Sequence, residues 1–410
     1  MSKEIKVGVV GVQRGMSFVN NAALCGLKLV ALCDVLEDKL LAADVGENVA
    51  RYTDYDEFLT HEMNAVILAN YFHEHAPFAI KALRAGKHVL SETACCKTIA
   101  EGVELAEAVE VSGLIYMLAE NYPYIKCCQE LRRIYQSGEL GRVTYAEGEY
   151  NHPFSPRERN QLGPGANHWR NLMPPSYYCT HAVAPLMHIT GLMPLSVVGL
   201  AIPAPEVLEG TAVAGDPGFV SLCQMENGAA FRLFGLVMPG HSIYYRIHGT
   251  KGAAETVRGP GYWGSEQLRV WHEEWDASEK YPTERIYKPD WPSLSTLAER
   301  AGHGGGDFWV EHYFSEAIRT GTQPFLDVYR GVAMSATGIL AWRSALVGGA
   351  SQAMPDFKNK DSRKKYLSDT LHPFHSAENA GEGIPQGING RRVPTAEDFA
   401  AAERDWAENE

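Results

Sequence analysis

The sequence has few cations for its length and lacks a long hydrophobic run. Its 410 residues include 37 Lys and Arg against 50 Asp and Glu, a formal net charge of −13 at pH 7. This balance argues against nucleic acid or an anionic membrane surface as partner, because both need clustered cations to neutralise phosphate. No apolar run reaches the length of a membrane span, and Met1 leads into a strand without the apolar segment of a secretory signal. The sequence therefore predicts a cytoplasmic protein with no membrane or nucleic acid partner.

Metal-binding and disulfide patterns are also missing. The 8 cysteines show no CxxC spacing, so they are expected to be reduced and buried. Two histidine pairs, His73 with His75 and His181 with His188, have no Cys or carboxylate partners at ligand spacing, so we predict no metal site. What is present is ordinary for a globular chain long enough for two domains, with 45% hydrophobic and 21% charged residues.

The clearest positive pattern lies in residues 65–92. An apolar run at 65–69 is followed by apolar residues at helical spacing over 79–83, by Gly86 and by a second apolar run. This order predicts a strand, a helix and a strand of a parallel sheet. Further elements that support a dinucleotide-binding α/β domain are a strand at 5–10, a helix at 18–24, a strand at 27–33 and a strand at 114–118. We therefore predict a Rossmann domain over residues 1–122.

The rest of the chain predicts an α+β domain at 123–349 and an extended arm at 350–410. A helix from 124 precedes strand-like runs separated by turn signals, at 143–150, 219–224, 229–236 and 243–249. Asp307 is expected to cap a helix to residue 318, and residues 328–346 to form another helix that packs back on the first domain. The polar composition after Gly349 favours an arm that extends toward a neighbouring subunit.

A cofactor site is predicted in the loop after the first strand. Gly11 and Gly15 stand where a tight turn brings backbone amides to a pyrophosphate, although Gln13 replaces the second glycine of GxGxxG. Asp34 ends the second strand, where a carboxylate accepts hydrogen bonds from both adenosine ribose hydroxyls and repels a 2′-phosphate. The sequence thus favours NAD over NADP, while Arg14 in the loop keeps NADP open. Alternatively, Asp34 only ends a strand and the two glycines only form turns.

Residues 75–92 resemble a signature of the Gfo/Idh/MocA family, the glucose-fructose oxidoreductase and inositol dehydrogenase relatives. Members have a helix ending in Ala-Gly-Lys-His-Val before a Glu-Lys-Pro turn, which here reads Glu92-Thr93-Ala94 without the lysine. The resemblance implies NAD, a second domain for substrate and oligomerisation with a large open, mostly antiparallel sheet, and a homo-dimer or homo-tetramer formed through that sheet. The further cofactor contacts that it implies are Asn70, Tyr71, His75, Glu92, Thr93 and Asn121.

The catalytic prediction rests on Tyr178-Cys179-Thr180-His181, which opens a helix-like run. Hydride removal from a secondary alcohol needs a base for the hydroxyl proton, and imidazole suits that role near neutral pH. In the family a histidine at this point faces the nicotinamide and the reacting hydroxyl, so the resemblance makes His181 the acid/base. Family dehydrogenases usually also have the lysine of Glu-Lys-Pro and an aspartate four residues before the histidine. Here Thr93 and Tyr177 occupy those positions.

This departure is similar to a branch of NAD-dependent glycoside hydrolases, typified by α-N-acetylgalactosaminidase, with Tyr-x-Thr-His and a Glu-Val-Pro-like turn. In that branch NAD oxidises a ring hydroxyl, the ketone acidifies the neighbouring C–H, the glycosidic substituent is eliminated, water adds and the hydride returns. Tyr178 and His181 would share the acid–base work. The segment from Asn121 to Tyr124 and the Gly-Gly-x-Asp turn after His303 also resemble this family.

The sequence therefore predicts an NAD-dependent oxidoreductase that removes hydride from a sugar or cyclic polyol. A redox-neutral NAD-dependent glycoside hydrolase is the alternative, and a cofactor-binding regulator in which His181 is dispensable is the third class. Besides His181 and Tyr178, Tyr124 is a catalytic candidate. Candidates for binding the carbohydrate are Tyr122, Tyr150, Trp169, Arg170 and His303. Each of these is also compatible with an ordinary packing role.

Overall fold

The structure is a computed structural model that describes residues 4–163, 165, 167–259, 264–375 and 383–408. It divides into two compact units. Unit 1 comprises residues 1–126, 291–333 and 356–369, and unit 2 comprises residues 127–290, 334–355 and 370–410. Each unit contains one sheet.

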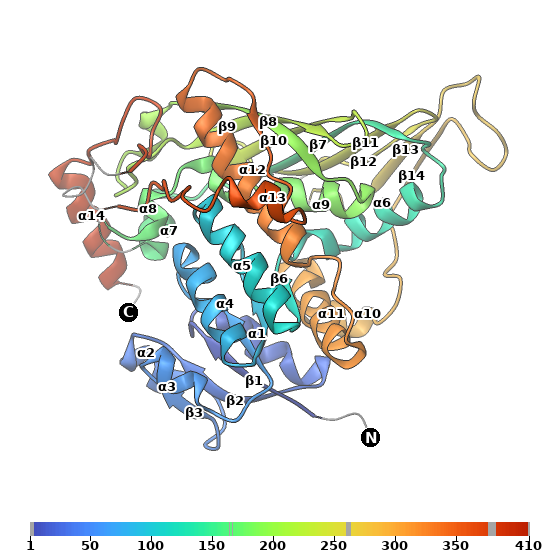
Figure 1. Cartoon of the computed structure of the whole chain (residues 1–410). Helices are drawn as coiled ribbons and strands as arrows, with labels where there is room; N and C mark the ends of the chain where they lie inside the picture. The colour runs from blue at the N-terminus through green and yellow to red at the C-terminus, as the bar shows by residue number, and fades with distance from the viewer. Residues whose placement is uncertain (1–3, 164, 166, 260–263, 376–382, 409–410) are drawn as a thin grey trace. The chain divides into compact units, whose positions relative to one another are not determined.

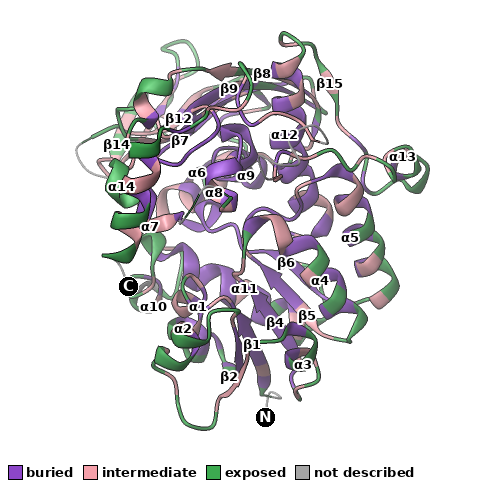
Figure 2. Cartoon of the chain, turned by 90° about the vertical axis from the view of Figure 1, so that its left-hand side faces the viewer, coloured by how far each residue is buried: buried purple, intermediate pink, exposed green. Residues whose placement is uncertain are grey.

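Unit 1 is built on a six-stranded sheet in the order β3-β2-β1-β4-β5-β6, with every pairing parallel. The strands are β1 (Ile5–Val10), β2 (Leu27–Cys33), β3 (Ala50–Tyr52), β4 (Ala65–Leu68), β5 (His88–Ser91) and β6 (Tyr116–Leu118). All four residues of β4 are buried, as expected where helices cover both faces of a parallel sheet (Figure 2). The strand order reverses between β1 and β4, and folds of this kind bind ligands at that point.

Helices flank this sheet, and α4 and α5 run side by side (Figure 1). The α-helices are α1 (Gly15–Ala22), α2 (Glu37–Ala42), α3 (Tyr55–Leu59), α4 (His75–Arg84), α5 (Ile99–Ser112), α10 (Ser295–Ala298), α11 (Gly306–Thr320) and α13 (Lys360–Lys364). The 3-10 turns are η1 (Ala23–Cys25), η2 (Phe72–Glu74), η3 (Tyr122–Tyr124) and η6 (His303–Gly305). The predicted Rossmann α/β fold is confirmed.

Unit 2 contains a nine-stranded sheet in the order β14-β13-β12-β11-β7-β10-β9-β8-β15. Its strands are β7 (Val143–Asn151), β8 (Pro194–Ile202), β9 (Gly218–Met225), β10 (Ala230–Leu236), β11 (Ser242–Gly249), β12 (Ala253–Thr256), β13 (Leu268–Trp271), β14 (Glu284–Tyr287) and β15 (Gln352–Ala353). Only the β7–β10 pair is parallel among the described pairings. The predicted large, mostly antiparallel sheet is thus confirmed.

The helices of unit 2 include α6 (Lys126–Gln136) and α9 (Thr180–Thr190), which lie on one face of this sheet (Figure 1). The others are α7 (Pro156–Leu162), α8 (Trp169–Leu172) and α14 (Ala396–Ala407), with η4 (Pro175–Tyr178) and η5 (Pro205–Leu208). The division between the units falls within α12 (Val328–Leu346). Among the described residues, no helix is long and apolar enough to span a bilayer.

Two sequence predictions were wrong. The helix α11 begins at Gly306 after Gly305, and Asp307 does not cap it because its carboxylate is bound to other side chains. The described part of 350–410 is not an extended arm, since β15 pairs with β8 and the side chain of Asp398 on α14 accepts a hydrogen bond from the backbone of Gly210. Polar contacts hold this segment in place, so its polar composition did not indicate that it is folded.

The close packing of α9 on β7 depends on a glycine. A Cβ on Gly148 would lie 2.0 Å from the carbonyl oxygen of Ala182, in the first turn of α9. We expect Gly148→Ala to displace this helix and lower the free energy of unfolding by roughly 1–3 kcal/mol, the usual cost of overpacking. Denaturant unfolding measures the loss. Gly46→Ala is the matched control, because no atom lies within 4 Å of a Cβ there, and an equal loss in both variants would contradict the prediction.

Candidate functional site

The loop between β1 and α1 is the candidate cofactor site of unit 1. Gly11 has a φ of +88°, and a Cβ on it would lie 2.3 Å from the carbonyl oxygen of Ala69. Only glycine fits there without a shift of the backbone. Gly15 begins α1, and a Cβ on it would lie 2.7 Å from Cγ1 of Val9. The exposed side chain of Gln13 lies between these two close approaches.

Asp34 follows β2 and lies beside the same loop. One carboxylate oxygen accepts a hydrogen bond from the backbone N–H of Val12 at 2.8 Å, and the other accepts one from Leu36 at 2.9 Å. Each oxygen retains acceptor capacity for a further donor, such as a ribose hydroxyl. Burial and the nearby charge of Asp34 raise the pKa of Tyr71, which keeps that phenol protonated near neutral pH. The structure thus brings the predicted carboxylate to the glycine loop.

Arg14 is held by two carboxylates. Its Nε donates to Glu92 at 2.6 Å, and its Nη1 and Nη2 donate to the two oxygens of Asp307, both at 2.8 Å. This bidentate geometry is the strongest form of a side-chain ion pair. The cation that left NADP open is therefore balanced by two negative charges, which weakens the argument for a 2′-phosphate.

Asp307 is the centre of this network. Its side chain has no exposed area and also contacts Nδ2 of Asn121 at 2.9 Å and Nδ1 of His303 at 2.9 Å. Burial alone would raise the pKa of Asp307, but the hydrogen bonds from Arg14 and His303 and the charge of Arg14 outweigh burial and hold the pKa well below its usual range. The sequence pointed to a turn here, but the pairing with Arg14 was missed.

Two further predicted residues, His75 and Asn70, differ in their hydrogen bonding. His75 is buried, and its ring nitrogens lie 2.8 Å from the carbonyl oxygen of Ala94 and 3.2 Å from that of Asn70. Burial lowers the pKa of His75, and the neutral ring has one N–H to donate to one of these two carbonyl oxygens. The buried amide of Asn70 makes no hydrogen bond of good geometry within the described residues, although Glu74 lies nearby. An orphaned amide beside a glycine cradle fits a bound dinucleotide.

The remaining predicted residues of unit 1 lie around η3 and the turn after β5. Thr93 is buried, and its backbone N–H donates to Glu92 at 3.1 Å. Tyr122 and Tyr124 are both buried, and the ring of Tyr124 lies 5.0 Å from that of Tyr313 on α11. The structure therefore places Tyr124 in an aromatic cluster of unit 1.

His181 is the centre of a separate cluster of predicted residues, in unit 2. It lies in the first turn of α9 with a side chain that is 7% exposed. The rings of Tyr150 and Tyr178 meet its imidazole edge-on, with centroids 4.5 Å and 5.0 Å away. The hydroxyl of Tyr245 on β11 donates to the backbone oxygen of His181 at 2.7 Å. The structure thus brings together three predicted residues and adds Tyr245, for which the sequence had no signal.

Trp169 and Arg170 lie on α8 in the same unit. The guanidinium of Arg170 lies 4.4 Å from the ring centroid of Trp169 and covers one face of the indole. The backbone oxygen of Arg170 accepts a hydrogen bond at 2.9 Å from Nη2 of Arg159 on α7. Sequence reasoning missed Arg159, because nothing in its neighbourhood distinguishes it from a surface arginine.

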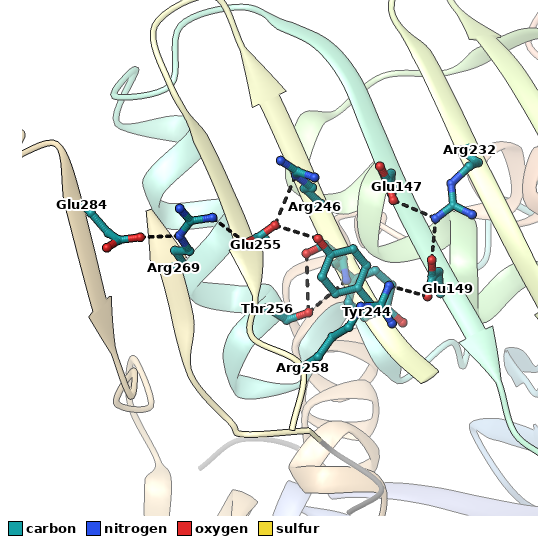
Figure 3. A network of polar contacts seen from close by, with 11 residues as sticks. Glu147, Glu149, Arg232, Tyr244, Arg246, Glu255, Thr256, Arg258, Arg269 and Glu284 are labelled. Atoms are coloured by element: carbon teal, nitrogen blue, oxygen red, sulfur yellow. Dashed lines mark hydrogen bonds and ion pairs between the residues drawn. The ribbon is translucent and has the colours of Figure 1, made fainter. Parts of the chain in front are cut away.

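A separate polar network covers the other face of the nine-stranded sheet (Figure 3). Arg232 on β10 pairs with Glu147 and Glu149 on β7, and Arg269 on β13 pairs with Glu255 on β12. An open hollow of about 480 Å³ lies along this face and is lined by residues of β11, β12 and β13 and of the segments that follow β11 and β13. It contains none of the predicted site residues.

No metal site appears in the part of the chain that the structure describes. No group of three or more His, Cys, Asp or Glu residues there is arranged to hold a metal ion.

Two family models each match a part of this chain. Residues 5–120 match the oxidoreductase family with an NAD-binding Rossmann fold, Gfo/Idh/MocA, and residues 236–364 match the glycosyl hydrolase 109 C-terminal domain. A glycosyl hydrolase family 109 protein of Solibacter usitatus is 26% identical, over 86% of this chain and 88% of that protein. The α-N-acetylgalactosaminidase of Tannerella forsythia is 25% identical, over 86% of each chain.

Solved structures share the fold. Levoglucosan dehydrogenase, in complex with NADH and L-sorbose, superposes with a TM-score of 0.68 and 19% identity, over 86% of this chain and 99% of that one. The myo-inositol 2-dehydrogenase of Lactobacillus plantarum has a TM-score of 0.63 and 19% identity, over 86% and 100% of the two chains.

Proposed function

We propose, from the premise that this chain joins an NAD-binding domain of the Gfo/Idh/MocA oxidoreductase family to a glycosyl hydrolase 109 C-terminal domain, that it is a redox-neutral NAD-dependent glycoside hydrolase. The observation that carries this proposal is the edge-on contact of the Tyr178 ring with His181 at the start of α9. In unit 1, Thr93 stands at the sequence position where the resemblance expects the dehydrogenase lysine. The order of the two functions predicted from sequence is thereby reversed. The relatives named glycosyl hydrolase and α-N-acetylgalactosaminidase support the reversal.

The cofactor would be held by the glycine loop, by Asp34 and by the amide of Asn70, as argued above. Bound NAD supplies a hydride acceptor that is restored within one turnover. His181 takes the proton of the ring hydroxyl that is oxidised, which is general base catalysis. Tyr178, whose ring meets the imidazole at 87°, takes part in proton transfer at the neighbouring carbon and at the leaving oxygen. Water then adds, and the same two groups return the protons.

One experiment distinguishes this proposal from a plain NAD-dependent sugar dehydrogenase, which the Rossmann domain and a histidine base also support. Purified protein is incubated with free sugars and with aryl glycosides, while NADH absorbance and aryl release are followed in the same wells. Aryl release without net NADH, stimulated by added NAD, is the expected result. NADH that accumulates in proportion to sugar, with no aryl release, would establish the dehydrogenase instead.

Asp34 provides a test of cofactor binding. We expect Asp34→Asn to weaken NADH binding by about 10- to 100-fold, the usual cost of losing a charged hydrogen-bond acceptor. The variant should also have a smaller preference for NADH over NADPH. Fluorescence titration with both cofactors measures the change. Asp38→Asn is the control, because Asp38 is exposed on the neighbouring helix α2. A preference for NADH that survives in Asp34→Asn would contradict the assignment.

The open face of the nine-stranded sheet is our candidate for a homo-oligomer interface. Leu200 on β8 and Leu222 on β9 are exposed on neighbouring strands of this sheet, and Leu222 is the register partner of Arg232, which belongs to the charged network of Figure 3. Exposed apolar residues rimmed by polar ones are typical of interaction surfaces. We expect light scattering to give the mass of two or four chains, and Leu222→Glu to lower it. A wild-type protein with the mass of one chain would contradict this expectation.

A further inference from the structure

Arg159 is an unusual residue of unit 2. Its side chain lies on α7 and is only 8% exposed. Its Nη2 donates to the backbone oxygen of Arg170, but its Nε makes no hydrogen bond within the described residues. No carboxylate of those residues pairs with either arginine, whereas Arg157 on the same helix pairs with Glu408. A buried cation without an anionic partner is costly, so a role for the charge is expected.

The surroundings of Arg159 add to this cost. Burial, followed by the charge of Arg170, lowers the pKa of Arg159 to about 10, while Tyr178 acts in the opposite direction. The residue is still protonated near neutral pH. Arg170 and Tyr178 therefore both lie close enough to Arg159 for their charges to act on it, and the ring centroid of Tyr178 lies 5.0 Å from that of His181. The charge of Arg159 thus lies near Tyr178, one member of the proposed acid–base pair.

A chain with a net charge of −13 has many carboxylates that could neutralise this pair, yet none of those described does so. The guanidinium group has a planar fork of donors that matches an oxyanion with two oxygens. We propose that Arg159 and Arg170 bind an anionic substituent of the sugar that reacts at His181, so that the substrate is an acidic glycoside. This inference rests on the proposed function. It narrows the substrate class to sugars that carry a carboxylate or a sulfate group.

A binding experiment on the wild-type holoprotein tests the proposal without requiring turnover. Calorimetric titration with D-glucuronate, a sulfated monosaccharide and D-glucose is expected to show at least about tenfold tighter binding of one or both acidic sugars, weakening with added salt. Tighter binding of D-glucuronate would identify the anion as a carboxylate, and tighter binding of the sulfated monosaccharide would identify it as a sulfate. D-Glucose binding as tightly as both acidic sugars would overturn the proposal.

Variants locate the effect. We expect Arg159→Gln to reduce the ratio of affinities for the acidic and neutral sugar by about 10- to 100-fold. Arg157→Gln is the matched control on the same helix, because Arg157 is exposed and paired with Glu408, and it should leave the ratio unchanged. Arg159→Lys, which keeps the charge, replaces the Gln variant if the thermal melt shows misfolding, and should reduce the ratio less. An unchanged ratio in a folded Arg159→Gln protein would also overturn the proposal.

The failure of this proposal can be told apart from that of the proposed function. Acidic aryl glycosides that bind tightly but release no aryl group would contradict the hydrolase and leave the anion site standing. Release of the aryl group from neutral glycosides, with no preference for acidic ones, would support the hydrolase and contradict the anion site.

Discussion

His181→Ala is expected to lower kcat/KM for glycoside cleavage by about 10²- to 10⁴-fold, the usual contribution of a general acid or base. The reason is that the imidazole, fixed between the rings of Tyr150 and Tyr178, is the group in this cluster best suited to accept a proton near neutral pH. The fold should survive, because the backbone oxygen of residue 181 keeps its hydrogen bond from Tyr245. Aryl release with saturating NAD measures the loss.

The control for this variant is His248→Gln. His248 lies on β11 in the same unit and is only partly buried. It lines the hollow on the face of the sheet that carries the charged network of Figure 3, away from α9. It should retain wild-type activity. Retention of NADH binding in His181→Ala would separate a catalytic defect from a cofactor defect. Full activity of His181→Ala would instead favour a cofactor-binding regulator or another catalytic group.

Asp307→Ala is expected to lower the free energy of unfolding by about 3–5 kcal/mol, the usual cost of removing one partner from a buried ion pair. The variant leaves Arg14 with Glu92 alone and removes the acceptor of Asn121 and His303. Because Arg14 lies in the glycine loop, NADH binding should weaken as well. Denaturant unfolding and NADH titration of the same preparation measure the two effects.

Glu316→Gln is the matched control on α11. Glu316 forms an exposed pair with Arg319, and such pairs contribute about 0–1 kcal/mol. Its unfolding curve should therefore overlay that of the wild type. If Asp307→Ala were no less stable than this control, the network around Arg14 would have no structural role.

The pH dependence of stability has a definite sign at Asp307. Its pKa in the folded protein lies below its usual value, so the unfolded chain binds the proton more readily. The stabilising contribution is fully present above the unfolded-state pKa of about 3.9 and is lost progressively as the pH falls below it. The difference in unfolding free energy between wild type and Asp307→Asn should therefore shrink as the solution is acidified.

Much of unit 1 followed from local sequence, because its signals are periodic and short-range. The apolar run of β4 and the helical spacing of α4 determine a strand and a helix whatever lies elsewhere in the chain. Gly11 had to be glycine because its backbone is left-handed and approaches Ala69 closely. Asp34 could be placed beside the glycine loop because the end of β2 lies beside the end of β1 in any sheet of this order.

Only the tertiary structure decided which charged residues meet. Arg14 and Asp307 are 293 residues apart, and no pattern in the sequence links them. Arg157 and Arg159 are two positions apart on one helix, yet one is exposed and paired while the other is buried without a carboxylate. The physical reason is that burial and ion pairing depend on what the topology brings against a side chain, whereas the sequence records only its near neighbours.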